Sequence, residues 1–165
     1  MNIGVVLLLW LLPLRVDAVA FAVPELVGTA GASETSIFLL QDLTDDLRGR
    51  LEIKERVHVT LVDHNPLVMS VETLNGRGGP FVISVDREFI QELSHAEIEA
   101  AIAHELGHVW IYTHHPYLQT ERLANDIAMR VVNRSAFEPV YEKVWSRTGI
   151  RGNLIEFLGP PTQQQ

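Results

Sequence analysis

The sequence predicts an α+β fold, a small antiparallel sheet of about three strands packed on one long helix and two to three further helices. Three apolar or β-branched segments, at residues 57–62, 67–74 and 81–85, are bounded by turn residues, which is typical of strands. Short links between consecutive strands favour antiparallel pairing. At 165 residues, 47% hydrophobic and 21% charged, the chain has the size and composition of one globular domain.

Helical patterns flank the predicted strands. Before them, apolar residues spaced three or four apart predict a helix over residues 35–51. After them, residues 86–93 form a short predicted helix, and residues 94–97 (Ser-His-Ala-Glu) are a capping box that opens a longer one. This longer helix runs to about Thr113, because Pro116 disfavours helical backbone just before itself.

Two further helices complete the prediction. Apolar residues at helical spacing predict one over residues 119–132, where Ala124 and Ala128 allow close packing. Residues 135–138 (Ser-Ala-Phe-Glu) match a second capping box and predict a helix that runs to about Trp145. We expect residues 21–158 to form a single domain and residues 159–165 to be a flexible tail.

The first twenty residues have the pattern of a secretory signal peptide. The apolar run at residues 3–14 is shorter than the roughly 20 residues that a membrane-spanning helix needs. Arg15 and Asp17 end this run, and residues 18–20 (Ala-Val-Ala) offer the small-x-small pattern that signal peptidase cleaves. We therefore expect a signal peptide over residues 1–20, which is cleaved, and a secreted or periplasmic protein without an integral membrane domain. A retained N-terminal anchor is the alternative.

Charge and composition exclude several classes of function. The net charge of −8 disfavours nucleic acid as a partner, because polyanions bind basic surfaces. The chain has no cysteine, which excludes disulfides, thiolate zinc sites and cysteine nucleophiles. A metal site in this chain must therefore use histidine, aspartate or glutamate side chains.

Residues 104–108 read His-Glu-Leu-Gly-His inside the longest helix after the strands. On a helix, His104 and His108 lie one turn apart on the same face, so both imidazoles can reach one tetrahedral cation. Glu105 projects beside them, where it can take a proton from a metal-bound water. The pattern predicts one Zn²⁺ per chain, a metal that two imidazoles and a carboxylate suit well.

A catalytic zinc needs a third protein ligand, and the sequence offers two candidates. Glu121 opens the next predicted helix, and its carboxylate can complete the site if the two helices pack together. His114 follows His108 by six residues, the third position of the HExxHxxGxxH pattern. Ile111, however, stands where that pattern needs a glycine for a sharp turn. We therefore favour Glu121 and keep His114 as the alternative.

Other polar side chains are candidates for supporting roles. Asn125 or Asp126 could accept the outer N–H of a ligand histidine and fix its tautomer. An oxyanion that develops during hydrolysis needs a hydrogen-bond donor, which could be any of Tyr112, His114, His115 and Tyr117, just past the motif helix. An edge of the strand at residues 81–85 could bind an extended substrate through backbone pairing.

The motif and its continuation resemble a known class of enzymes. His-Glu-Leu-Gly-His, followed by a helix with Glu-x-x-Ala-Asn-x-x-Ala, is similar to the gluzincin-type HExxH zinc metallopeptidases. The stretch over residues 84–130 resembles the compact peptidase domains of the HtpX-like and ImmA/IrrE-like families. The resemblance implies a minimal zincin-like domain in which His104, His108 and Glu121 bind zinc and Glu105 is the general base.

These observations predict a secreted or periplasmic zinc-dependent metalloendopeptidase, in which a zinc-bound water activated by Glu105 hydrolyses peptide bonds. The expected partners are a peptide or protein substrate and an envelope protein. The alternative is a non-catalytic or latent zinc-binding module that acts as an adaptor or chaperone-like partner of a membrane or envelope complex. The presence of Glu105 disfavours this alternative, because a purely structural site needs no base.

Overall fold

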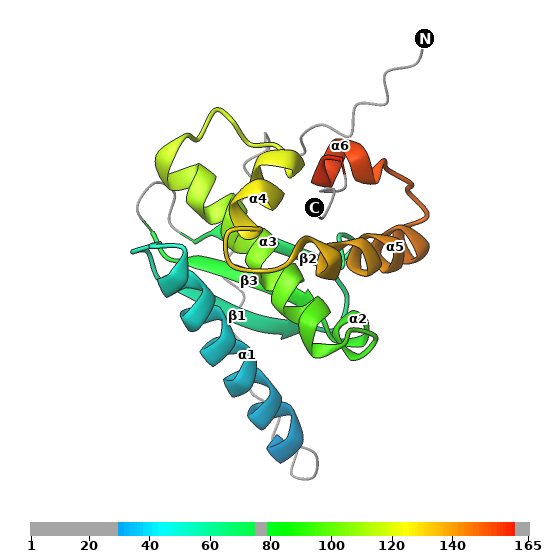
Figure 1. Ribbon diagram of the computed structural model, residues 1–165. Coiled ribbons are helices and arrows are strands. Elements are labelled where there is room, and N and C mark those ends of the chain that lie inside the picture. Colours follow the sequence, from blue (N-terminus) through cyan, green and yellow to red (C-terminus); the bar gives the residue numbers. More distant parts are fainter. Residues whose placement is uncertain (1–29, 75–78, 161–165) are drawn as a thin grey trace, which may run out of the picture. The chain divides into compact units, whose positions relative to one another are not determined.

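The computed structural model describes residues 30–74 and 79–160 (Figure 1). The expected signal peptide and residues 161–165 of the expected tail lie outside these ranges. In chain order the elements are α1 (Ala30–Arg50), β1 (Val57–Val62), β2 (Met69–Thr73), β3 (Phe81–Asp86), α2 (Arg87–Gln91), α3 (His95–His114), α4 (Glu121–Ala128), a 3₁₀ turn η1 (Arg134–Ala136), α5 (Phe137–Thr148) and α6 (Leu154–Leu158). None of the helices in the two described ranges combines the length and apolar character that crossing a bilayer requires.

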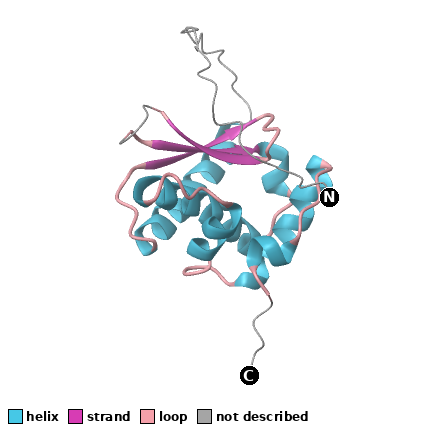
Figure 2. Ribbon diagram, turned by 90° about the horizontal axis from the view of Figure 1, so that it is seen from above, coloured by secondary structure: helices cyan, strands magenta, loops and turns pink. Residues whose placement is uncertain are grey.

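The fold is α+β, as predicted, with one three-stranded sheet. Figure 2 shows most of the helices on one side of this sheet. The strand order is β1-β3-β2, so β3 is central. β2 pairs with β3 in the antiparallel sense, with Met69 opposite Val85, but β1 pairs with β3 in parallel, with Val57 opposite Phe81. The predicted all-antiparallel sheet is therefore wrong for β1.

The link between β1 and β2 explains this topology. Asn65 in the link donates its backbone N–H to Asp86 Oδ2 (3.1 Å) and its side-chain amide to the Ser84 carbonyl (2.9 Å). These bonds carry the chain past the end of β3, so β2 pairs with the far edge of β3 instead of folding back on β1. The central place goes to the strand whose alternate residues Phe81, Ile83 and Val85 are all buried. Link length alone does not reveal such an insertion.

The two edges of the sheet differ. Gln41 of α1 covers the outer edge of β1, because its side chain bonds the Val57 carbonyl (2.9 Å) and the Val59 N–H (3.0 Å). Both edges of β3 are paired, so the predicted free edge at residues 81–85 is wrong. The outer edge of β2 pairs with no other described strand.

The helix that carries the His-Glu-Leu-Gly-His motif begins as predicted. The Ser94 side chain accepts from the Glu97 N–H, and the Glu97 side chain accepts from the Ser94 N–H, so the capping box is formed. Within α3, Ala103, Leu106 and Val109 are fully buried. The helix ends at His114, before the proline that predicted its end.

The next helix is shorter than the predicted 119–132. α4 spans Glu121–Ala128, because the Thr120 side chain accepts from the Leu123 N–H and caps the helix there. Gln119 is thus left outside the helix, in the link that follows α3. The last predicted residues of this helix instead lead into the turn before η1.

The C-terminal part departs most from prediction. The second capping box is not formed: α5 begins at Phe137 without a side-chain cap, because Glu138 instead forms an ion pair with Arg134. The short helix α6 was not predicted. Gly159, where we expected a flexible tail to begin, is buried, and its carbonyl accepts a hydrogen bond from Arg134 Nη2 (2.9 Å).

Candidate metal centre

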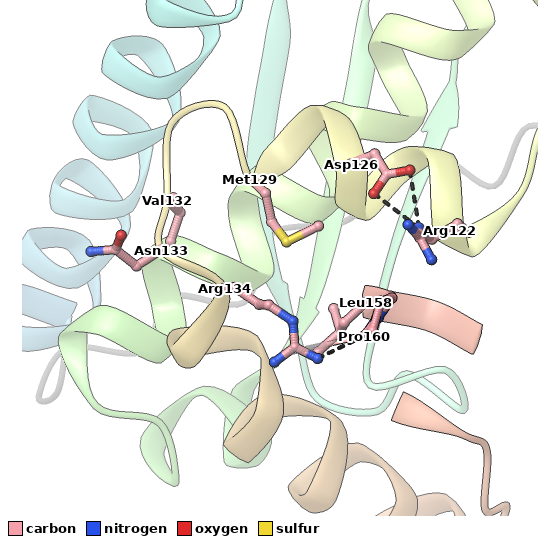
Figure 3. Close-up of a pocket in the computed structure, with 9 residues that line it drawn as sticks. Arg122, Asp126, Met129, Val132, Asn133, Arg134, Leu158 and Pro160 are labelled. Atoms are coloured by element: carbon pink, nitrogen blue, oxygen red, sulfur yellow. Dashed lines mark hydrogen bonds and ion pairs between the residues drawn. The ribbon is translucent and has the colours of Figure 1, made fainter. Parts of the chain in front are cut away.

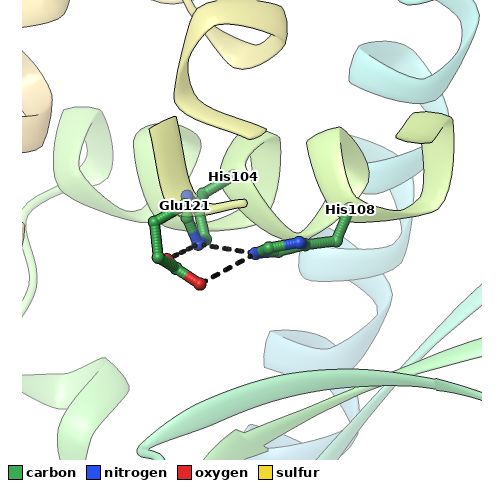
Figure 4. A group of neighbouring side chains, drawn as sticks. All are labelled: His104, His108 and Glu121. Atoms are coloured by element: carbon green, nitrogen blue, oxygen red, sulfur yellow. Dashed lines mark hydrogen bonds and ion pairs between the residues drawn. The ribbon is translucent and has the colours of Figure 1, made fainter. Parts of the chain in front are cut away.

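Three side chains converge on one point between α3 and α4 (Figure 4). The Nε2 atoms of His104 and His108 lie 3.2 Å apart. The Glu121 carboxylate faces both, with Oε2 at 3.1 Å from His104 Nε2 and Oε1 at 3.5 Å from His108 Nε2. The imidazoles are largely buried, and the Glu121 side chain is half-exposed. The structure therefore brings together the two motif histidines and the favoured third residue.

Close packing of α3 on α4 makes this convergence geometrically possible. Gly107 lies between the two histidines, and a Cβ atom at this position would stand 2.3 Å from the Ala124 carbonyl oxygen. Only glycine lets the α4 backbone come so near. Because Thr120 caps α4, Glu121 is its first residue and stands at the end of the helix that faces the histidines.

The tautomer of His104 is set by its outer hydrogen bond. His104 Nδ1 lies 2.8 Å from Asn125 Oδ1. The amide group of Asn125 points its nitrogen at the Phe157 carbonyl (3.0 Å), which can only accept a hydrogen bond. Asn125 must therefore present its oxygen to His104, which donates from Nδ1–H. The Nε2 atom is left with its lone pair toward Glu121 and His108.

His108 is fixed in the same way by a residue that the sequence did not single out. Its Nδ1 atom lies 3.0 Å from Gln119 Oε1, while Gln119 Nε2 donates to the backbone carbonyl of His108 (3.2 Å). That carbonyl again forces the amide oxygen toward the imidazole. His108 therefore donates from Nδ1–H and also turns the lone pair of Nε2 toward the cluster.

Two lone pairs and a carboxylate that face one point repel each other unless a positive charge lies among them. Zinc bonds to nitrogen and oxygen of about 2.0–2.1 Å place tetrahedral donor atoms roughly 3.3 Å apart. The two Nε2 atoms lie 3.2 Å apart, and each lies near a different oxygen of Glu121, at 3.1 and 3.5 Å, so these separations are close to that spacing. The residues present therefore fit a zinc ion in both donor type and arrangement.

Without a metal, a proton is the cation that this cluster can hold. Burial alone would lower the pKa of His104, but the hydrogen bond and charge of Glu121 raise it from the ordinary 6.5 to about 9. For Glu121, burial raises the pKa, and the two histidines outweigh burial and hold it well below its usual range. The cluster is thus a candidate cation site.

Glu105 lies beside the cluster but is not tied to it. The residue is only 7% exposed. Burial raises the pKa of its carboxyl group, while the nearby charges of His104 and His108 act in the opposite direction. In the described part of the chain its carboxyl group forms no ion pair. A buried carboxyl group next to a cation site is available for proton transfer.

The other predicted site residues fall into two groups. Of the alternatives Asn125 and Asp126, Asn125 bonds the histidine, whereas Asp126 is held by Arg122 Nε at 2.9 and 3.0 Å. His114, the alternative ligand, is not part of the cluster: its ring stacks on Trp110 (centroids 4.1 Å apart), and its Nδ1 contacts the Trp110 carbonyl (2.9 Å).

The predicted oxyanion donors, which lie in the last turn of α3 and just after it, do not gather at the cluster either. Tyr117 is 90% exposed. The rings of His114 and His115 lie against Trp110, and the ring of Tyr112 packs edge-on against Phe81 (5.4 Å). These contacts place the side chains in packing or in solvent rather than beside Glu121.

Tyr141 of α5 is the aromatic residue that does reach the site. Its ring lies edge-on to His104 (6.2 Å between centroids), and its hydroxyl oxygen is 2.6 Å from Asn125 Nδ2. Burial, together with the carboxylates of Glu121 and Glu105, raises the pKa of its hydroxyl. Helical spacing marks Tyr141 only as a packed residue, because its role depends on how α5 docks on α4.

A hollow of about 360 Å³ is lined by residues of α4, η1 and α6 and of the links beside them. Figure 3 shows Arg122, Met129, Arg134 and Leu158 around it. None of the three clustered residues lines this hollow. The chemistry described above is therefore located at the face between α3 and α4, outside the hollow.

No family model, no curated protein and no solved structure matches this chain. Across residues 30–74 and 79–160, His104, His108 and Glu121 form the one group of three or more histidine or carboxylate side chains whose donor atoms all lie within 4.8 Å of one another. Any function assigned to this chain has to account for this group of donor atoms.

Proposed function

We propose that this chain is a zinc-dependent metallopeptidase, in which His104, His108 and Glu121 hold zinc and Glu105 is the general base. The observation that supports this best is the convergence of two imidazole lone pairs, each fixed by a carboxamide, and one carboxylate on the same point. A buried carboxyl group stands beside them. Structural sites are usually closed by four protein ligands, whereas three ligands leave a position for water or substrate.

A bound zinc ion would polarise the scissile carbonyl and make water more acidic. Glu105 takes a proton from the water whose oxygen attacks the carbonyl carbon. Glu105 then gives this proton to the leaving amine nitrogen as the carbon–nitrogen bond breaks. The burial that raises the pKa of Glu105 helps its carboxyl group to hold the proton between these two transfers.

Tyr141 is the best candidate for a donor to the developing oxyanion. Its hydroxyl oxygen accepts from Asn125 Nδ2, so its own hydrogen points elsewhere. No described residue accepts that hydrogen. The hydroxyl group is held next to the cluster and can donate to negative charge that forms there. Tyr141 thus takes the role that the sequence suggested for Tyr112, His114, His115 or Tyr117.

The position of β2 at an edge of the sheet favours an extended peptide as the substrate. Alternate residues of an antiparallel edge strand direct N–H and C=O groups away from their partner. The ring of Tyr112, in the last turn of α3, packs on Phe81, which is opposite Thr73 of β2. The strand edge thus runs near the motif helix, where backbone pairing could align a peptide.

Residues 1–20 support a secreted or periplasmic location.

The test is to replace Glu105 with Gln and compare zinc content and peptide hydrolysis with the wild type. We expect about one zinc per chain in both proteins and a loss of hydrolysis of about 100-fold or more in the variant. Glu99→Gln, on the same helix, is the matched control and should behave as the wild type. A Glu105→Gln protein that keeps full biological activity would favour the non-catalytic zinc module instead.

A further inference from the structure

Asn125 connects the metal centre with the C-terminal part of the chain. The residue is 0% exposed. Its oxygen accepts from His104 Nδ1 (2.8 Å), and its nitrogen donates to two groups, the Tyr141 hydroxyl (2.6 Å) and the Phe157 carbonyl (3.0 Å). Both the oxygen and the nitrogen of the Asn125 amide are thus hydrogen-bonded. Two of the three partners, Tyr141 and Phe157, belong to α5 and α6.

The two partners of the amide nitrogen are not equivalent. A hydroxyl group can donate or accept, so Tyr141 could bond either end of the Asn125 amide. A backbone carbonyl can only accept, so Phe157 accepts only the nitrogen end. Without Phe157, a rotated Asn125 would present its NH₂ group to His104 and favour the proton on Nε2. That tautomer has no lone pair left at Nε2 for a metal.

The position of the Phe157 carbonyl depends on how α6 is held. The Phe157 ring stacks on Tyr141 (5.3 Å, 15°) and leans on Trp145 (6.2 Å). Leu158 is buried, and Arg134 Nη2 donates to the Gly159 carbonyl (2.9 Å). These contacts anchor the short helix through side chains of α5 and η1.

We propose that α6 is a positioning element of the metal centre: the Phe157 carbonyl orients the Asn125 amide, and Asn125 in turn keeps His104 in the tautomer that binds metal through Nε2. The effect on metal affinity rests on the proposed function, whereas the effect on the His104 tautomer does not. Phe157 is a positioning residue here, because it acts on the histidine through Asn125.

Gly152→Ala tests the proposal without touching the cluster. A Cβ atom at this position would stand 2.2 Å from Phe157 Cε2 and 2.9 Å from Trp145 Cζ2, so the Phe157 ring has to leave its stack. Gly49→Ala, with nothing within 4 Å of the new Cβ, is the matched control. Two readouts apply: the zinc dissociation constant from chelator competition, and the solvent exchange of the His104 Nδ1–H proton by NMR.

We expect Gly152→Ala to weaken zinc binding about tenfold or more and to speed exchange of the His104 Nδ1–H proton. The control should change neither. Normal zinc affinity and normal proton exchange in folded Gly152→Ala would overturn the proposal. If that variant does not fold, Phe157→Leu, which removes the ring stack alone, should move both readouts in the same direction, and no movement would again overturn it.

The second readout separates this proposal from the metal assignment. A wild-type protein that binds no zinc would contradict the proposed function. Proton exchange at His104 would still report whether α6 holds Asn125, and its acceleration by Gly152→Ala would support the positioning role. The double variant Gly152→Ala/Asn125→Asp adds a further check, because a carboxylate presents an acceptor to His104 whichever way it turns. In that background, Gly152→Ala should have little further effect.

Discussion

The residues that orient the two histidines are carboxamides, which carry no charge. Among the three proposed ligands and the two residues that orient them, Glu121 is therefore the one that carries a negative charge. Glu105 is a further carboxyl group nearby. A divalent ion held by two neutral imidazoles and one carboxylate keeps a net positive charge of one. Such a centre attracts the electron-rich oxygen of a peptide carbonyl more strongly than one buttressed by carboxylates would.

Gln119→Leu tests the importance of orienting His108. The substitution removes the acceptor at His108 Nδ1 and the donor to the His108 carbonyl, so we expect zinc affinity to fall roughly tenfold. Because Gln119 is exposed, the free energy of unfolding of the metal-free protein should change little. Chelator competition and urea unfolding measure the two quantities. Gln91→Leu, another exposed glutamine, is the control, and equal zinc affinities in the two variants would contradict the prediction.

At the scale of residues, the sequence predicts best the contacts that follow from the geometry of a single helix. The spacing of His104 and His108 places them together, and helix packing makes Glu121 a natural third member. Asn125 and Asp126 could not be separated, because neighbouring helical positions differ by about 100° and the docking angle decides between them. Gln119 and Tyr141 were missed because they reach the site from a link and from a later helix.

At the scale of elements, local signals predicted bounds better than pairings. The strand at residues 57–62 has the predicted ends, and the capping box at residues 94–97 is formed. The parallel pairing of β1 with β3 was not visible, since it depends on hydrogen bonds between Asn65 and the far end of β3. The capping box expected at residues 135–138 is not formed, because Glu138 forms an ion pair with Arg134 instead.

Gly107→Ala tests how closely α3 and α4 must pack. The added Cβ atom would meet the Ala124 backbone at 2.3 Å, and backbone atoms cannot rotate away as a side chain can. We expect a loss of about 1–3 kcal/mol in the free energy of unfolding and weaker zinc binding, because Glu121 moves away from the histidines. Urea unfolding and zinc titration check both effects. Gly49→Ala should be neutral or slightly stabilising, and the same result for Gly107→Ala would refute close packing here.

For the molecule as a whole, the cluster predicts a dependence of stability on pH. In the metal-free fold, burial lowers the pKa of His104, but Glu121 raises it to about 9, above the ordinary 6.5. A raised pKa contributes stability that is complete below pH 6.5 and is lost as the pH rises through 9. The metal-free protein should therefore unfold at lower urea concentration at pH 9 than at pH 6.

Zinc should reverse this trend, because the metal takes the place of the proton at Nε2. Zinc binding then competes with protonation and strengthens as the pH rises. Urea midpoints measured with chelator and with zinc at pH 6, 7.5 and 9 test both parts. Glu121→Gln is the control, since removal of its charge should abolish most of the pH dependence of the metal-free protein. Parallel curves with and without zinc would contradict the prediction.

The distribution of the site along the chain has a consequence for the order of assembly. The donor atoms come from residues 104–121, on two helices joined by a short link, whereas the groups that orient Asn125 come from residues 141 and 157. Contacts between near neighbours in sequence form faster than contacts that close long loops. We therefore expect a nascent chain to bind the proposed zinc weakly once α3 contacts α4, and to bind it tightly only after α5 and α6 have packed.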